Sequence, residues 1–343
     1  MPVCARLLVP ALRRAVRCAV APLLAGLALL ASGLAHAELT IRFAHVVAED
    51  TPKGLAVQRF AQLVAERAPG RIRVAIYPNA QLYGDSDEFE ALQVGAVEML
   101  APSLSKFGRV GFPEFELFDL PFLFDNLAEV RQLTKGPLGQ RLLAGLGRQG
   151  LVGLGYVDNG FKQMSAHRPL LAPADFQGLR MRVQSSRVIA AQMRALGATP
   201  VTLPFSQTHD ALARHIVQGT ENPLSNFWTQ RMDSVQSDLS LTQHAYLGYA
   251  VITSQRFWHS LTEADRRLLA QALREALAHG NQIADQQNDK ALIALRRAGT
   301  TQVHTLSPTQ RAGLRAAVQP VYEQLGQRIG PTWLSDAQRA RGR

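Results

Sequence analysis

The chain has 343 residues, of which 37 are Lys or Arg and 27 are Asp or Glu, and its formal net charge is +10. That length is enough for two domains of ordinary size. The basic residues are spread along predicted helices with acidic residues among them and no interleaved aromatic residues, so the composition argues against nucleic acid as a partner and favours a small anionic ligand.

The first 37 residues have the pattern of an export signal. Four arginines and no acidic residue precede or enter an apolar run that ends at Leu34, and Ala35-His36-Ala37 forms an A-x-A cleavage site. The run is shorter than the roughly 20 residues of a membrane-spanning helix. We therefore predict a signal peptide over residues 1–37, cleaved after Ala37, and a mature chain that is not embedded in the membrane. The Arg13-Arg14 pair leaves twin-arginine export open, although the general secretory route is preferred.

No catalytic, metal or cofactor site is predicted in the mature chain. Both cysteines, Cys4 and Cys18, precede the cleavage site, so a disulfide, a thiolate nucleophile and a cysteine metal site are excluded. The nine histidines include no H-E-x-x-H motif and no i,i+4 pair. Neither a G-x-S-x-G elbow nor a P-loop is present. The sequence therefore predicts a binding protein rather than an enzyme.

The mature chain opens with an alternation of strands and helices. Period-2 apolar patterns predict strands at 39–43, 72–76 and 97–101, and helical spacing predicts helices over Leu55–Ala68 and Asp85–Val94. This order predicts a largely parallel sheet, whose loops gather at the strand ends where ligands bind in open α/β folds.

Three polar residues follow these strands and are expected to face one crevice. Lys53 lies near the end of the first loop, and Ser103 and Lys106 follow the third strand. From the residues alone, the more common alternative is that both lysines are solvated surface charges.

The middle of the chain contains an aromatic segment, two predicted helices and a glycine motif that resembles a dinucleotide-binding motif. Residues 112–124 are rich in aromatics, and two prolines argue against a central strand, so we expect packing under the floor of the cleft. Helices are predicted over Leu127–Leu133 and Pro137–Arg148. The formal G-x-G-x-x-G at 145–150 follows a helix and precedes a strand at 151–157, the reverse of a dinucleotide site, so it is interpreted as a helix end and turn.

A second strand and helix alternation runs to Asn222. Asp158–Gly160 is predicted to be a turn, after which a strand beginning at Phe161 crosses into a second lobe. Arg182 follows Met181 in a short alternating strand and should point away from the apolar face, where its planar fork can hold a carboxylate through two parallel hydrogen bonds.

Two further side chains should converge with Arg182 on one small ligand. Phe205 and Asn222 both stand at the ends of short predicted elements, and a small organic acid is the natural ligand for the set. Asn222 could instead be a helix N-cap, because Pro223 would then occupy the first helical position.

The C-terminal part is predicted to be helical. A capping box at Ser260–Glu263 opens a helix that reaches Ala298 and stops at Gly299, and its 36 residues would span about 54 Å. Ser307-Pro308 caps a further helix, and the basic tail from Gly326 onward is expected to be partly frayed.

Several stretches together resemble one protein family. These are FAHVVAEDTPKG, YPNAQLYGDSDEFEALQVGAVEML, APSLSKF, FELFDLPFLF, DNGFKQMSAHRP, GLRMRVQSS, LGATPVTLPFS, TENPLSN and QHAYLGY. In this order they are similar to the periplasmic solute-binding subunits of TRAP transporters, DctP type, in the dicarboxylate-binding branch. The resemblance covers nearly the whole mature chain.

The resemblance implies a fold and a division into lobes. The fold is an α/β, two-lobed periplasmic binding protein of type II-like form, each lobe a mixed sheet flanked by helices, with a long helix spanning both. Lobe I would comprise 38–159 and about 248–287, and lobe II 160–247 and about 288–343. The expected ligand is a C4-dicarboxylate such as malate, succinate or fumarate, passed to the integral-membrane subunits of the transporter.

The resemblance also assigns roles to site residues. Arg182 and Asn222 would hold one carboxylate and Phe205 would cover the apolar carbons. The distal acid would be held by Lys53, Ser103 and Lys162, with further candidates Gln184, Asn226 and His244. The family commonly has Asp where Gln218 stands and Asn-His-Gly where Gln243-His244-Ala245 stands, which could tune ligand length or closure.

Two other functions stay open at this point. The same fold could bind a keto acid, a sugar acid or a monocarboxylate. Alternatively, the protein could present its ligand to a membrane kinase as a periplasmic sensor subunit. A hydrolase ranks third, because no residue pattern supports one.

Overall fold

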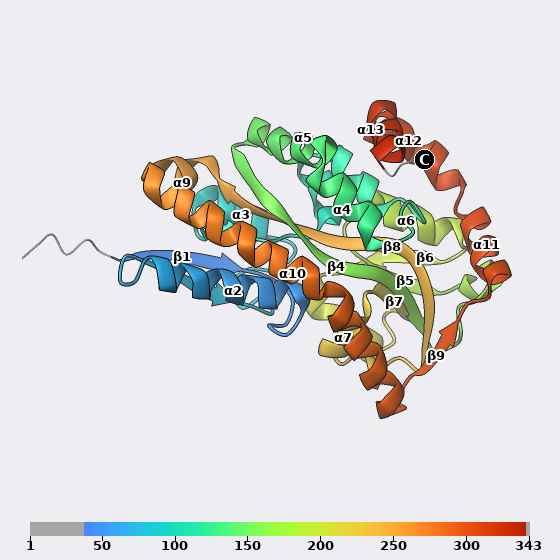
Figure 1. The fold of residues 1–343 in the computed structure, drawn as a ribbon. Coiled ribbons are helices and arrows are strands. Elements are labelled where there is room, and N and C mark those ends of the chain that lie inside the picture. The colour runs from blue at the N-terminus through green and yellow to red at the C-terminus, as the bar shows by residue number, and fades with distance from the viewer. Residues whose placement is uncertain (1–37, 341–343) are drawn as a thin grey trace, which may run out of the picture. The chain divides into compact units, whose positions relative to one another are not determined.

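The structure is a computed structural model that describes residues 38–340, so the predicted signal peptide lies outside the described residues. A nine-stranded mixed sheet has the strand order β2-β1-β3-β8-β4-β7-β5-β6, with β9 paired to β8 (Figure 1). The strands are β1 (Leu39–Ala44), β2 (Ile72–Tyr77), β3 (Met99–Leu100), β4 (Leu151–Ala166), β5 (Arg180–Val183), β6 (Thr199–Thr202), β7 (Gly219–Asn222), β8 (Asp238–Ser254) and β9 (Gln302–Thr305).

Helices flank this sheet, and the predicted α/β class is confirmed. They are α2 (Pro52–Arg67), α3 (Glu88–Val94), α4 (Leu127–Lys135), α5 (Pro137–Gly145), α6 (Arg187–Ala195), α7 (Thr208–Ala213), α8 (Leu224–Thr229), α9 (Gln255–Ser260), α10 (Glu263–Ala298), α11 (Pro308–Ala317), α12 (Pro320–Ile329) and α13 (Pro331–Ala340). Short 3₁₀ helices are η1 (Leu104–Val110), η2 (Pro113–Asp119), η3 (Leu146–Gln149), η4 (Pro173–Phe176), η5 (Phe205–Gln207) and η6 (Met232–Ser234).

Two long antiparallel strands, β4 and β8, hold the sheet together. On one side of the pair, β3 joins β8 at Ile252 and Thr253, and on the other, β7 joins β4 from Gln163 to Ser165. Between these points, over residues 151–162, β4 is paired with β8 alone among the described strands. The sheet is therefore narrow in the middle and wider at both ends.

The turn predicted at Asp158–Gly160 is wrong. β4 runs through these residues, and both flanks pair with the same strand, β8. The ladder shifts register between Asp158 and Gly160, so the sequence that reads as a turn forms a bulge instead. Gly160 has φ +145, a conformation that an L side chain rarely adopts.

Helix α10 confirms the predicted long helix and lies along β4 and α2 (Figure 1). Its N-cap is Thr262, whose hydroxyl accepts from the N–H of Asp265, so the capping box predicted at Ser260 is displaced by two residues. Gly299, with φ +65, closes the C-terminus as predicted.

Two asparagines of α10 supply hydrogen bonds to the unpaired edge of β4. The side chain of Asn281 accepts from the N–H of Asp158 at 2.7 Å and donates to the carbonyl of Tyr156 at 3.3 Å. An amide side chain can accept and donate at once, as a neighbouring strand would do. Asn281 therefore satisfies backbone groups that have no strand partner at this edge.

Asn288 makes a similar connection two helical turns further on. Its Nδ2 donates to the carbonyl of Asn159 at 2.6 Å, and its Oδ1 accepts from the N–H of Ser225 at 3.1 Å. Ser225 belongs to α8, so one side chain ties α10, the bulge of β4 and α8 together.

Other element boundaries differ from the sequence prediction. α2 begins at Pro52 rather than Leu55, because the Thr51 hydroxyl accepts from the N–H of Gly54. α3 begins at Glu88, which leaves Asp85 in the preceding loop. The third strand shrinks to the two residues of β3.

Predictions for the middle of the chain and for the C-terminal tail can also be compared with the structure. The glycine motif ends η3 at Gly150, with φ +72, directly before β4, as interpreted from the sequence. Residues 112–124 pack as expected, with Phe115 and Phe118 buried. The expectation of a frayed tail is wrong for the described residues, because α12 and α13 continue to Ala340 and Ala337 is fully buried.

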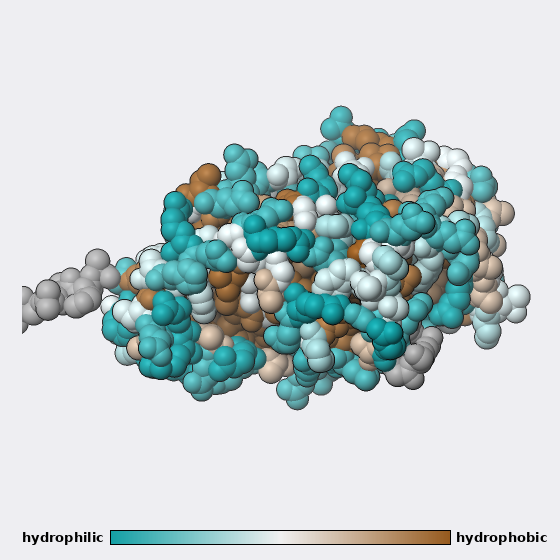
Figure 2. Space-filling view, turned by 90° about the horizontal axis from the view of Figure 1, so that it is seen from above, coloured by the Kyte–Doolittle hydropathy of each residue, from teal (hydrophilic) through white to brown (hydrophobic). Residues whose placement is uncertain are grey.

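Hydrophilic side chains cover most of the face seen in Figure 2, where apolar residues show in separate patches. Among residues 38–340, every helix is too short or too polar to cross a bilayer.

Asn288→Ala should destabilise the fold by about 1–3 kcal/mol, because the carbonyl of Asn159 and the N–H of Ser225 lose their partner. Urea unfolding measures the change. Asp289→Ala, at an exposed position of the same helix, is the control and should change stability by less than about 0.5 kcal/mol. Equal midpoints for both variants would contradict the structural role of Asn288.

Candidate functional site

Two adjoining cavities lie where loops from both ends of the sheet meet. The first, of about 20 Å³, is lined by Val46, Val47, Asp85, Ser103, Lys106, Gln184, Phe205, Asn222, Asn226, Leu247 and Tyr249. The second, of about 110 Å³, is lined by Asp85, Ser86, Lys106, Arg109, Arg182, Gln184, Ser185, Thr202, Leu203 and Pro204. Three residues belong to both cavities, namely Asp85, Lys106 and Gln184.

The structure brings six of the nine predicted site residues to these cavities. Five line the first cavity, namely Ser103, Gln184, Phe205, Asn222 and Asn226, and Arg182 lines the second. Arg182 and Asn222 lie near the C-terminal ends of β5 and β7. Ser103, Gln184 and Phe205 follow strands, and Asn226 lies in α8.

Arg182 is 1 % exposed and only partly satisfied by the protein. Its Nε and Nη2 donate to the carbonyl of Leu203 at 3.0 and 2.8 Å, and its guanidinium lies 5.7 Å from the centre of the Phe205 ring. The Nη1 group has no hydrogen-bond partner among the described residues. A buried cation with a free N–H beside a cavity is a strong donor for an anionic ligand.

Asp85 is the main site residue that sequence reasoning missed. It forms an ion pair with Lys106 and accepts a hydrogen bond from the backbone N–H of Phe205. Burial raises the pKa of Asp85, but the Lys106 ammonium, the Phe205 N–H and Arg182 together outweigh burial and hold the pKa at about 2. The sequence predicts a helix over Asp85–Val94, whereas α3 begins at Glu88 and Asp85 lies in the loop before it. The signal available was the acidic YGDSDEF stretch in the connection between a predicted strand and the next helix.

Lys106, which sequence analysis left open as a surface charge, is 4 % exposed and lines both cavities. Its ammonium also pairs with Glu88. Two acidic partners offset the cost of burying this charge.

Contacts between distant loops close the site. The Ser103 hydroxyl donates to Oε1 of Gln184 at 2.6 Å, and the Phe205 N–H reaches Asp85. The Nδ2 of Asn226 donates to the Tyr249 hydroxyl at 3.4 Å. Asn222 ends β7 while Pro223 is the N-cap of α8, so the alternative that Asn222 caps the helix is wrong.

Lys53 is fully buried one layer behind the cavities. Its Nζ donates to the carbonyl of Ala101 at 3.0 Å and lies 3.7 Å from the centre of the Tyr249 ring. Burial, with the Lys106 ammonium, lowers the pKa of Lys53 to about 7. Tyr249 lines the first cavity, so Lys53 supports that wall from behind.

Lys162 and His244 lie in a separate buried cluster and line neither cavity. The Nζ of Lys162 is 3.0 Å from Glu221 and 3.7 Å from Asp119, and the Nε2 of His244 is 3.7 Å from Glu221. Burial raises the pKa of Glu221, but Lys162 and His244 together outweigh burial, and the pKa is lowered overall. Burial raises the pKa of Asp119 to about 6 despite the same ammonium.

Comparisons with known proteins agree with the fold. The sequence profile of the bacterial extracellular solute-binding proteins, family 7 (DctP), matches residues 43–328. The C4-dicarboxylate-binding periplasmic protein DctP of Rhodobacter capsulatus is 47 % identical over 292 residues, covering 85 % of this chain and 88 % of that protein.

Solved structures of similar proteins also match this chain over most of its length. A TRAP periplasmic solute-binding protein from Shewanella oneidensis with bound succinate has a TM-score of 0.87 at 40 % identity, over 89 % of this chain and all of that one. The sugar-acid-binding protein of Advenella mimigardefordensis in complex with galactonate has a TM-score of 0.86 at 31 % identity, over 89 % of this chain and 98 % of that one.

The raised pKa of Asp119 predicts a pH dependence of stability. Because the folded pKa is about 6 and the ordinary value is 3.8, the stabilising effect of its proton is present below pH 4 and lost as pH rises through 6. From pH 4 to pH 7.5 the wild type should therefore lose on the order of 1–3 kcal/mol relative to Asp119→Asn. Thermal unfolding across this range measures it, with Asp50→Asn on the surface as the control. A constant difference between wild type and Asp119→Asn would show that folding does not raise the pKa of Asp119.

Proposed function

The chain belongs to the DctP family of bacterial extracellular solute-binding proteins, family 7, and from this premise we propose that it captures a C4-dicarboxylate such as succinate, malate or fumarate for a TRAP transporter. The ligand would be bound without chemical turnover and passed to the integral-membrane subunits. The protein would bind its ligand in the periplasm, after removal of residues 1–37.

The free Nη1 of Arg182 is the observation that carries this proposal. A ligand carboxylate would satisfy it, and Phe205 would cover the apolar carbons from the adjoining cavity. A charge-assisted hydrogen bond of this kind contributes about 1.5–3 kcal/mol. Asn222, on the wall of the first cavity, would add a neutral donor.

A diacid needs positive charge at its second end as well. We assign that end to Lys106 and Ser103 in place of Lys162, because Lys106 lines both cavities whereas Lys162 faces Glu221 and Asp119. Lys53 would act through Tyr249 rather than by direct contact. His244 would act through Glu221.

A sugar acid is the second candidate, because the Advenella protein in complex with galactonate has nearly the same fold. The small volumes of the two cavities, about 20 and 110 Å³, favour the shorter acid.

The two lobes are part of the proposal. Lobe I would comprise 38–159 and about 248–287, and lobe II 160–247 and about 288–343. The narrow middle of the sheet supports this division, since only β4 and β8 pair there. Ser103 and Asp85 on one side meet Gln184 and Phe205 on the other, so a ligand between them would favour the closed form.

Calorimetry with succinate, malate and fumarate tests the function, with galactonate for the second candidate. The wild type should bind a four-carbon diacid saturably, and Arg182→Lys should lose most of the affinity because one ammonium cannot replace a planar fork. Arg182→Ala should weaken binding by well over tenfold. Arg187→Ala, at an exposed position five residues later, is the control and should bind normally. Near-native affinity in both Arg182 variants would place the anchor elsewhere.

Closure of the two proposed lobes on the ligand predicts a decrease in the radius of gyration. Small-angle scattering of the wild type should show a smaller radius of gyration with a saturating diacid than without it, because a ligand that touches both lobes stabilises the closed form. Arg182→Ala at the same diacid concentration should show no decrease. Tight binding without any change in the wild type would indicate a preformed pocket.

A further inference from the structure

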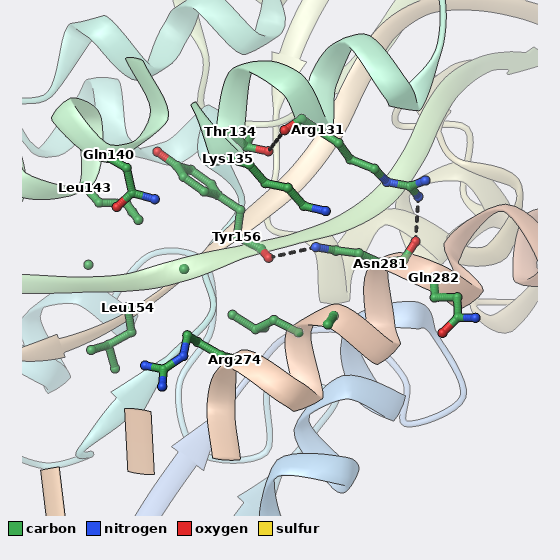
Figure 3. A pocket seen from close by; sticks show the side chains of 14 residues that line it. Arg131, Thr134, Lys135, Gln140, Leu143, Leu154, Tyr156, Arg274, Asn281 and Gln282 are labelled. Carbon is green, nitrogen blue, oxygen red and sulfur yellow. Dashed lines mark hydrogen bonds between the residues drawn. The ribbon is translucent and has the colours of Figure 1, made fainter. Parts of the chain in front are cut away.

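A groove of about 530 Å³ lies outside the proposed ligand site, between α4, α5, β4 and α10 (Figure 3). It has no lining residue in common with the two cavities that Arg182 and Asn222 line. Its volume is within the range of about 300–1,000 Å³ that is ordinary for small-molecule sites.

The groove collects positive charge from two walls. Arg131 and Lys135 come from α4, and Arg274 comes from α10 on the opposite side (Figure 3). No acidic residue is among the side chains that line it. Asp158, which is buried behind the floor, accepts a hydrogen bond from Arg131 at 2.7 Å. The guanidinium of Arg131 is thus already engaged.

Lys135 and Arg274 differ from Arg131 in this respect. Neither has an acidic partner within 4 Å among residues 38–340. Lys135 gains some stabilisation from the C-terminal end of α4. That explanation does not extend to Arg274, which lies in the interior of α10 and has no acidic residue three or four positions away. Two uncompensated cations therefore border one groove.

The floor of the groove is apolar. Leu143 and Leu277 pack against β4 at Gly153 and Gly155, where a Cβ atom would come within 2.7 Å of Leu143 and 2.6 Å of Leu277. Leu154 lies between the two glycines at a register shift of the ladder and has no partner in β8. Its side chain is partly exposed, so the groove offers apolar surface beneath its cations.

We propose that this groove binds an organic anion with an apolar chain or ring. The acid group would lie between Lys135 and Arg274, and the apolar part would cover Leu143, Leu154 and Leu277. The diacid of the proposed function fits this chemistry poorly, because it has no apolar end to place on the leucines. The groove would thus be a second binding site for a different class of anion.

The probe for a test is 8-anilinonaphthalene-1-sulfonate, which combines a sulfonate with fused rings and fluoresces in apolar surroundings. Titration of the folded chain should give saturable fluorescence. The double variant Lys135→Gln/Arg274→Gln should bind the probe with about tenfold lower affinity, because two charge contacts are lost. The matched control Lys290→Gln/Arg296→Gln removes one lysine and one arginine from the exposed surface of α10 outside the groove, and should bind the probe normally.

Two further arms define the site. Arg182→Ala should retain probe binding, which separates the groove from the proposed diacid site. Displacement of the probe by acetate, hexanoate and decanoate should strengthen with chain length, because each buried CH₂ adds about 0.8 kcal/mol, or roughly fourfold. Displacement of the probe is then compared between decanoate and phosphatidylglycerol vesicles, with the double variant as reference. Displacement by decanoate alone would identify a free acid as the ligand, and displacement by the vesicles would identify a lipid.

Three results would overturn the proposal. The first is fluorescence that does not saturate. The second is equal probe affinity in the wild type and the Lys135→Gln/Arg274→Gln variant, with circular dichroism confirming that both are folded. The third is displacement by acetate as effective as displacement by decanoate, which would leave no role for the leucines.

Discussion

The antiparallel pairing of β4 with β8 is the constraint on which the rest of the structure depends. The ladder runs from Leu151 opposite Ser254 to Ala166 opposite Asp238, and every other strand joins the sheet at one end of it or the other. Because its middle has strand neighbours only within the pair, two asparagines of α10 complete the hydrogen bonding of β4 there. The cavities form where the loops from both ends of the sheet come together.

Burial of charge is the second organising feature. Lys53, Lys106, Lys162 and Arg182 are all at most 4 % exposed, and a buried cation is costly unless the protein supplies partners. Lys106 and Lys162 have carboxylates, and Lys53 has a carbonyl and an aromatic ring. Arg182 has a carbonyl and the Phe205 ring, but its Nη1 has no hydrogen-bond partner among the described residues, although it borders a cavity. The difference distinguishes a cation held for the structure from one that is available to a ligand.

Local sequence patterns predicted elements well where the pattern extends over several residues. The alternation around Arg182 and the apolar stripe of α10 both correspond to observed elements. Patterns of two or three residues failed. Asp158–Gly160 has turn composition, yet it lies in a continuous strand, because pairing with β8 on both flanks outweighs local turn preference. The sequence also predicts a helix from Asp85, whereas α3 begins at Glu88, because an acidic residue near a helix start fits several positions of the first turn.

The sequence by itself determined the α/β class, the long helix, the family resemblance and the positions of Arg182, Phe205 and Asn222 in or after short strands. These follow from periodicity, capping and motif order along the chain. Only the tertiary structure decided which lysine faces a cavity. Lys106 follows a predicted strand and Lys162 lies within one, and neither local pattern shows which lysine faces a cavity. What distinguishes them is the position of carboxylates distant in the chain, Asp85 and Glu88 for one and Asp119 and Glu221 for the other. Electrostatic partners are set by folding, so they cannot be read from neighbouring residues.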